Sequence, residues 1–256
     1  MQLHPLFFGL FCCLYLTSTA QIVNIEDKRT TPLDSTGWTG LFDAGFTLVD
    51  NGRRVITVNG RATVQAQRYR HTWMSFSDLA LVRAADQDFV NQGFQHLRYN
   101  YDWADRWTYE AFAQVQYNER ILVGLRTLLG TGVRHQLLST QEEKGLFVGL
   151  AYMYEYDEVA ERTIFHRDHR LSSYLSFRVR PTSTLRLAGT TYYQPLLTDW
   201  GTYRVSTRTQ ASLTITEKLS FTSTFELTYD ARLQEDAPEV PATIYKWVNG
   251  LRYVFK

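Results

Sequence analysis

Apolar and polar residues alternate with a period of two over most of this chain. In RWTYEAFAQVQYN (106–118), Trp107 and Tyr109 share one face, whereas Glu110 and Gln114 share the other. This alternation is typical of β-strands whose two faces meet different surroundings. Helical periodicity is scarce, and no apolar stretch beyond residue 20 is long enough to form a transmembrane helix. The chain is therefore predicted to be an all-β protein.

Twelve segments follow this pattern closely enough to be predicted as strands. They are residues 38–50, 54–68, 72–83, 89–102, 106–118, 121–138, 145–157, 169–180, 184–195, 203–216, 219–233 and 243–255. Alternation alone fits two architectures, a soluble exported β-sandwich that binds glycans and a transmembrane barrel, because it does not say which face is wet.

The first twenty residues, MQLHPLFFGLFCCLYLTSTA, combine an apolar core over 6–16 with small residues at 18–20. This pattern predicts a secretory signal peptide over 1–20, although the segment has no Lys or Arg. Residues 21–36 are expected to form a periplasmic N-terminal segment and 37–256 the barrel. Both cysteines, Cys12 and Cys13, lie in the leader. The mature chain is thus expected to use no disulfide, thiolate nucleophile or cysteine metal site.

The length of the strands and the character of their connections favour the membrane barrel. Most segments reach the roughly 9–11 residues that cross a bilayer at a tilt. If the amino terminus is periplasmic, the periplasmic turns are short, at 69–71, 103–105, 139–144, 181–183 and 217–218. The longer connections, 158–168, 196–202 and 234–241, then fall on the outer side. Short periplasmic turns and longer outer loops are expected of outer-membrane barrels with an even number of strands.

Aromatic residues gather near both ends of the predicted strands. The periplasmic group comprises Tyr69, Trp73, Tyr101, Trp103, Trp107, Tyr253 and Phe255. The outer group comprises Tyr117, Tyr154, Tyr156, Tyr193, Tyr203, Tyr229 and Tyr245. Such rings prefer the lipid headgroup zone, so two groups predict two membrane interfaces. The terminal strand, which closes on Phe255, resembles the sorting signal that the barrel assembly machinery reads, although here the aromatic residue is penultimate.

Several strings resemble the salt-induced outer-membrane protein family (domain of unknown function 481). They are NIEDKR (24–29), GWTGLFDAGF (37–46), YYQP (192–195), DWGTYRV (199–205) and NGLRYVFK (249–256). The resemblance implies an exported β-barrel in the outer membrane of a Gram-negative cell envelope. It supplies neither catalytic residues nor a substrate.

If the apolar faces meet lipid, the polar faces enclose a lumen that leans cationic. The inward basic residues would be Arg61, Arg98, Arg126, Arg134, Arg178, Arg180, Arg186, Arg204, Arg208 and Arg252. The inward acids would be Asp43, Asp102, Glu110, Glu226 and Asp230. Two interpretations stay open: a hydrogen-bonded network that fills a narrow barrel, or a porin-like diffusion channel for small anionic solutes. The candidate anion-facing residues are Arg178, Arg180, Arg186, Arg204 and Arg208.

Charge balance excludes other classes of protein. The chain has 27 Lys and Arg against 26 Asp and Glu, so no basic excess points to nucleic acid. The partners expected of an outer-membrane barrel are instead outer-membrane lipids, lipopolysaccharide and the assembly machinery.

The residues weighed for catalysis or metal binding do not form a convincing site. His166-Arg167-Asp168-His169 has two metal-ligand types but falls in a predicted loop, and Asp157 and Glu158 are interpreted as solvated charge. His135 and Ser173 are expected on lipid-facing sides of strands that are not neighbours, and no GxSxG motif is present. We expect no enzyme, metal or cofactor; a barrel enzyme acting on lipid or lipopolysaccharide is the alternative function.

Overall fold

Twelve antiparallel strands form one sheet in strict sequence order in the computed structural model, which describes residues 36–84, 87–140, 144–159, 161 and 163–255. The strands are β1 (Thr36–Asp50), β2 (Arg54–Arg68), β3 (His71–Ala84), β4 (Gln87–Ala104), β5 (Trp107–Asn118), β6 (Val123–Thr140), β7 (Lys144–Val159), β8 (Ile164–Val179), β9 (Leu185–Pro195), β10 (Tyr203–Thr214), β11 (Leu219–Asp230) and β12 (Thr243–Tyr253). A 3-10 turn, η1 (Glu119–Ile121), and a short helix, α1 (Ala231–Asp236), complete the elements. The predicted signal peptide and almost all of the predicted N-terminal segment lie outside the described residues.

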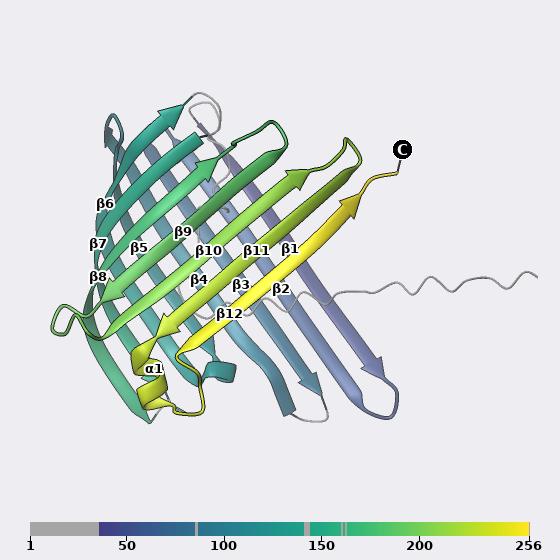
Figure 1. Cartoon of the computed structure of the whole chain (residues 1–256). Coiled ribbons are helices and arrows are strands. Elements are labelled where there is room, and N and C mark those ends of the chain that lie inside the picture. Colours follow the sequence, from purple (N-terminus) through teal and green to yellow (C-terminus); the bar gives the residue numbers. More distant parts are fainter. Residues whose placement is uncertain (1–35, 85–86, 141–143, 160, 162, 256) are drawn as a thin grey trace, which may run out of the picture.

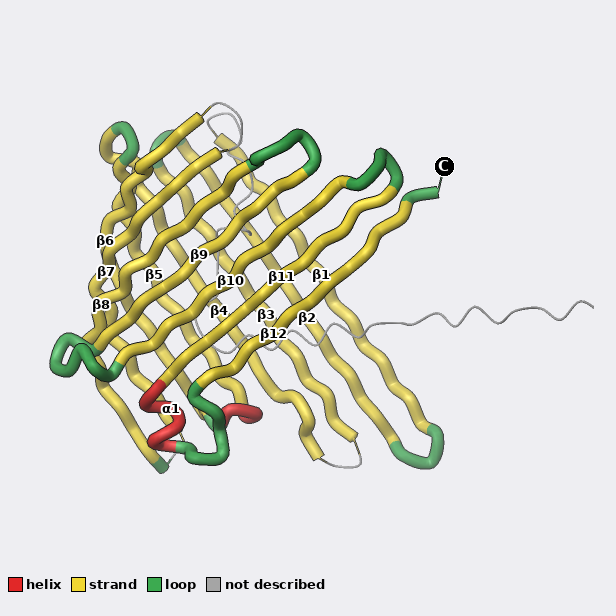
Figure 2. The backbone as a smooth tube through the Cα atoms, in the orientation of Figure 1, coloured by secondary structure: helices red, strands yellow, loops and turns green. Residues whose placement is uncertain are grey.

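The sheet curls round so that β1 to β4 lie behind β9 to β12 (Figure 1). Each strand pairs with its sequence neighbours, and among the described residues no pairing joins β1 to β12, so these two strands flank the seam. The C-terminal residues lie at the end that carries the β10–β11 turn, and α1 lies at the opposite end (Figure 2). This is the up-and-down barrel that the alternation predicts.

Polarity is inverted relative to a soluble protein. Large apolar side chains stand exposed on the outer face: Trp38 retains 78% of its accessible surface and Trp247 retains 68%. Charged side chains are buried inside, where Arg126 is 1% exposed and Glu155 is 0% exposed. Only hydrocarbon outside and a polar interior make this arrangement favourable, as in a bacterial outer-membrane barrel. The alternative of a soluble β-sandwich is therefore wrong, since a sandwich buries its apolar faces between two sheets.

Aromatic side chains mark both ends of the outer face. Trp73 and Trp103 are exposed beside the short turns of β2–β3 and β4–β5. At the opposite end, the Tyr203 ring packs against Tyr193 at 5.5 Å and Tyr229 at 5.3 Å between ring centroids. These contacts run across neighbouring strands, as expected of rings gathered at a membrane interface.

Three local predictions are wrong. Strand β8 begins at Ile164, so the predicted outer loop 158–168 is reduced to a tight turn, because β7 and β8 continue their pairing up to Val159 and Ile164. Residues 231–233, predicted as the end of a strand, begin α1, whose start is capped by the Asp230 side chain accepting from the Leu233 amide at 3.3 Å. Residues 121–122 end a 3-10 turn rather than begin a strand.

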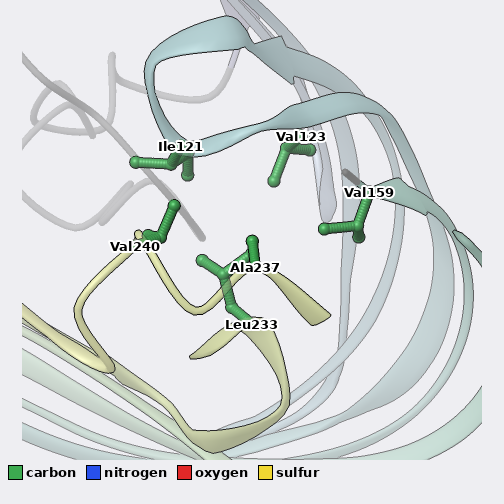
Figure 3. Packing of buried hydrophobic residues seen from close by; sticks show 6 residues of the cluster. All are labelled: Ile121, Val123, Val159, Leu233, Ala237 and Val240. Atoms are coloured by element: carbon green, nitrogen blue, oxygen red, sulfur yellow. The ribbon is translucent and has the colours of Figure 1, made fainter. Parts of the chain in front are cut away.

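The β11–β12 connection folds into the mouth of the barrel and packs against two strand tips. Leu233, Ala237 and Val240 come from this connection, while Ile121, Val123 and Val159 come from η1, β6 and β7 (Figure 3). All six side chains are buried. We call residues 231–242 the lid. In the described part of the chain, no helix has the length and apolar character needed to cross a bilayer.

Candidate functional site

A network of charged side chains fills the lumen beneath the lid. The Glu155 carboxylate lies at its centre and accepts hydrogen bonds from Nη1 and Nη2 of Arg204 at 2.8 and 3.2 Å. Arg204 Nε also donates to Asp230 Oδ2 at 2.9 Å. Arg170 Nε lies 3.3 Å from Glu155 Oε1. Because Glu155 is on β7 and Arg204 on β10, this contact crosses the lumen rather than following the sheet.

Other members of the network meet because the pairing of neighbouring strands places them opposite each other. We call the whole network the lid-side network. Arg126 stands directly opposite Asp157 across β6 and β7 and donates to it through Nε at 3.0 Å and through Nη2. The members are Arg126, Glu155, Asp157, Asp168, Arg170, Arg204, Asp230 and Arg232. Four arginines thus meet four carboxylates, so the set is formally neutral. Buried charges are tolerated only when paired in this way.

A second cluster fills the lumen nearer the short turns. Arg98 Nη1 lies 3.1 Å from Glu110 Oε2, and the Tyr174 hydroxyl donates to the same oxygen at 2.7 Å. The Arg134 guanidinium lies over the Phe147 ring at 3.9 Å. Between the two charged layers, Gln, Asn and His side chains bond to one another, as in the 2.9 Å contact of His96 with Gln114 and the 2.7 Å contact of Gln114 with Gln116. The half of the lumen formed by β4 to β9 is therefore occupied by its own side chains.

Away from the buried Arg204 and Asp230, the opposite wall, formed by β2, β3 and β10 to β12, carries charges that water reaches. Arg61 donates to Asp78 at 3.0 Å, and its side chain is 43% exposed. Arg208 pairs with Glu226, and its side chain is 31% exposed. Lys246 stands opposite Glu226 in register and interacts electrostatically with Arg208, Arg61 and Asp78. We call these five residues the open-wall cluster.

The five arginines predicted to face anions do not form one patch. Arg204 is buried in the lid-side network, and Arg208 belongs to the open-wall cluster. Arg178, Arg180 and Arg186 gather around the β8–β9 turn, where Arg180 Nη2 donates to the Ser183 carbonyl at 2.9 Å. Anion binding by these residues stays a prediction.

The lid is held to the barrel wall by one ion pair and one side-chain hydrogen bond. Arg232 pairs with Asp168, and His166 Nε2 lies 2.7 Å from Asp236 Oδ2. These contacts add to the apolar packing of Leu233 against the strand tips. The lid therefore covers the lumen on the side where the lid-side network lies.

The sequence did not predict that Asp157 and Asp168 belong to this network. Asp157 was expected to be solvated, yet it is buried against Arg126. Asp168 was expected in a loop, yet it lies in β8 and faces inward beside Arg170. The period of two within the predicted strand 145–157 already places Asp157 on the same face as Glu155, and the same period continued one residue before the predicted strand 169–180 places Asp168 on the face of Arg170.

The structure does not bring together the residues that were weighed for catalysis and metal binding. His166 and His169 differ by an odd number of positions in β8, so they face opposite sides of the sheet. His169 stands outside with its Nδ1 2.5 Å from the Tyr152 hydroxyl. The Ser173 hydroxyl donates to the Tyr193 carbonyl, and strand β7 separates it from His135. Within the described residues, no group of three His, Cys, Asp or Glu side chains could hold a metal ion.

An outward apolar face, an inward charged lumen and antiparallel strands in sequence order define a β-barrel of the outer-membrane type. Residues 43–241 match the family described as "Protein of unknown function, DUF481", and the chain belongs to this family. No curated protein matches it.

Two solved structures resemble the fold. The "NanC porin" structure is 13% identical with a TM-score of 0.44, covering 84% of this chain and 99% of that chain. The crystal structure of Pseudomonas aeruginosa OccK11 (OpdR) is 10% identical with a TM-score of 0.36, covering 86% of this chain and 80% of that chain.

Proposed function

We propose that the protein is a non-catalytic, narrow diffusion channel with a mild preference for small anions. The observation that carries the proposal is the unequal filling of the lumen. The half formed by β4 to β9 is packed with buried, mutually bonded side chains, whereas the open-wall cluster is partly exposed to water. A solute path therefore follows the wall of β2, β3 and β10 to β12.

The charge of this path supports the preference for anions. The open-wall cluster has three cations, Arg61, Arg208 and Lys246, against two acids, Asp78 and Glu226. Its formal charge is therefore one positive unit, while the lid-side network is neutral. Charged groups that line a narrow pore select ions of opposite sign.

Conductance in planar bilayers tests the proposal. The wild-type protein is expected to give discrete steps and, under a KCl gradient, a reversal potential of the sign that indicates chloride preference. Lys246→Glu should move the reversal potential toward potassium preference, because it changes the formal charge of the open-wall cluster from plus one to minus one. Lys218→Glu, the same change in the exposed β10–β11 turn, serves as the matched control and should have a smaller effect.

Silence of the folded wild-type protein would overturn the channel. The neutral, buried lid-side network then favours the second candidate, an envelope-structural barrel whose interior serves its own stability. Folding in that experiment is established separately by heat-modifiable migration in detergent gels.

A further inference from the structure

A groove on the outer face of β1 to β5 has a volume of about 410 Å³. It extends from Phe42 on β1 to Tyr117 on β5, and Gly60 and Gly93 form part of its floor. Phe42 is 76% exposed and stands opposite Ala62 in register, so the groove lies on the face that meets hydrocarbon. We call this feature the outer groove.

The groove exists because glycines lie between larger side chains. The Tyr117 ring lies over Gly93, where an added Cβ would come within 2.3 Å of it. At Gly60, by contrast, an added Cβ would meet nothing closer than the Leu79 Cβ at 4.0 Å. A side chain placed at Gly60 would therefore project into the groove without striking its own barrel.

The groove has the length and direction of a lipid chain in one leaflet. At the end of the groove nearer the lid, Tyr117 is the penultimate residue of β5, whereas at the other end Phe42 is near the middle of β1. Crossing five strands covers about 19 Å, because neighbouring strands are about 4.8 Å apart. With strands tilted by about 45°, this corresponds to about 13 Å along the membrane normal, roughly half of the apolar band of such barrels.

Two polar residues that line the groove, Ser77 and Gln95, together with the neighbouring Ser75, distinguish between kinds of lipid. Ser77 donates to Gln95 Oε1, and Gln95 Nε2 donates to Ser75 Oγ at 3.0 Å, all on the lipid-facing side. These two bonds use one of the two hydrogens on Gln95 Nε2 and the hydroxyl hydrogen of Ser77, so the second amide hydrogen and the Ser77 lone pairs have the capacity to bond to a lipid hydroxyl. In hydrocarbon such capacity is favourable only when a polar partner meets it. The hydroxylated acyl chains of lipopolysaccharide can exchange hydrogen bonds with these groups, whereas the plain chains of phospholipids cannot. We propose that the outer groove binds one acyl chain of lipopolysaccharide in the outer leaflet.

Binding of lipopolysaccharide to refolded, lipid-free barrel in detergent tests the proposal. Gly60→Leu should weaken binding roughly tenfold, the effect of excluding about two methylene groups from an apolar site. Ala211→Leu, which adds three carbon atoms to the outer face of β10 where Gly60→Leu adds four to that of β2, is the control and should bind as the wild type does. Native mass spectrometry counts the bound lipids, and heat-modifiable migration verifies that both variants fold.

Phosphatidylethanolamine, titrated in parallel, should bind more weakly than lipopolysaccharide. Equal binding of both lipids, or unchanged lipopolysaccharide binding by Gly60→Leu, would overturn the proposal. A wild-type dimer that Gly60→Leu converts to a monomer would also overturn it, because the groove would then be a contact between two copies. None of these readouts depends on conductance, so the channel proposal can fail independently.

Discussion

Replacing Glu155 with Ala should be among the most damaging single changes inside the barrel. The Glu155 carboxylate bonds to Arg204 at 2.8 and 3.2 Å and lies 3.3 Å from Arg170. Its loss leaves Asp230 near Arg204 and Asp168 near Arg170, so the lid-side network keeps four arginines for three acids. Removing one partner of a buried ion pair costs about 3–5 kcal/mol.

Urea unfolding in detergent micelles, followed by tryptophan fluorescence, measures this loss. The midpoint should fall while the dependence of the unfolding free energy on urea stays the same, provided that the variant still folds to the same compact state. Glu226→Ala is the matched control, because the Arg208–Glu226 pair is partly exposed. Such a pair contributes about 0–1 kcal/mol. Equal losses in the two variants would refute the claim that burial, rather than pairing alone, makes Glu155 important.

Three further changes test the lid, the strand packing and a loop. Leu233→Asp places a carboxylate in the buried lid cluster and should raise single-channel conductance by releasing the lid, an expectation that unchanged conductance would contradict. Gly132→Val should abolish heat-modifiable migration, because its Cβ would lie 2.3 Å from a backbone oxygen, whereas Gly60→Ala should migrate as the wild type does. The Thr202 hydroxyl and the Gly201 amide lower the pKa of Asp199 in the β9–β10 loop, so the order that these bonds give the loop is present above the ordinary aspartate pKa. As pH falls through the lowered pKa of Asp199, its carboxylate becomes protonated and the loop should lose this order. The amide chemical shift of Gly201 reports the change, and a shift that stays constant across this pH range would contradict the prediction.

The alternation of side chains determined most of the architecture. A period of two over long segments requires strands with two different faces, and the short turns fix antiparallel neighbours in sequence order. It also assigned Arg126, Arg204 and Asp230 to the inner face, which the structure confirms by burying all three. On β3, however, Met74 and Phe76 face inward with Asp78, so apolar character alone does not identify the lipid side.

Contacts across the lumen were decided by the tertiary structure alone. Glu155 and Arg204 are 49 residues apart on strands that are not neighbours, and only the curvature of the whole sheet brings them together. The lid required the same information, because α1 is stabilised by Ile121, Val123 and Val159 rather than by its own short sequence. The outer groove likewise depends on how five strands are staggered, since Gly60 and Gly93 form one surface only in that register. Local sequence periodicity records which way a side chain points, whereas the distance between facing walls depends on the closure of the sheet.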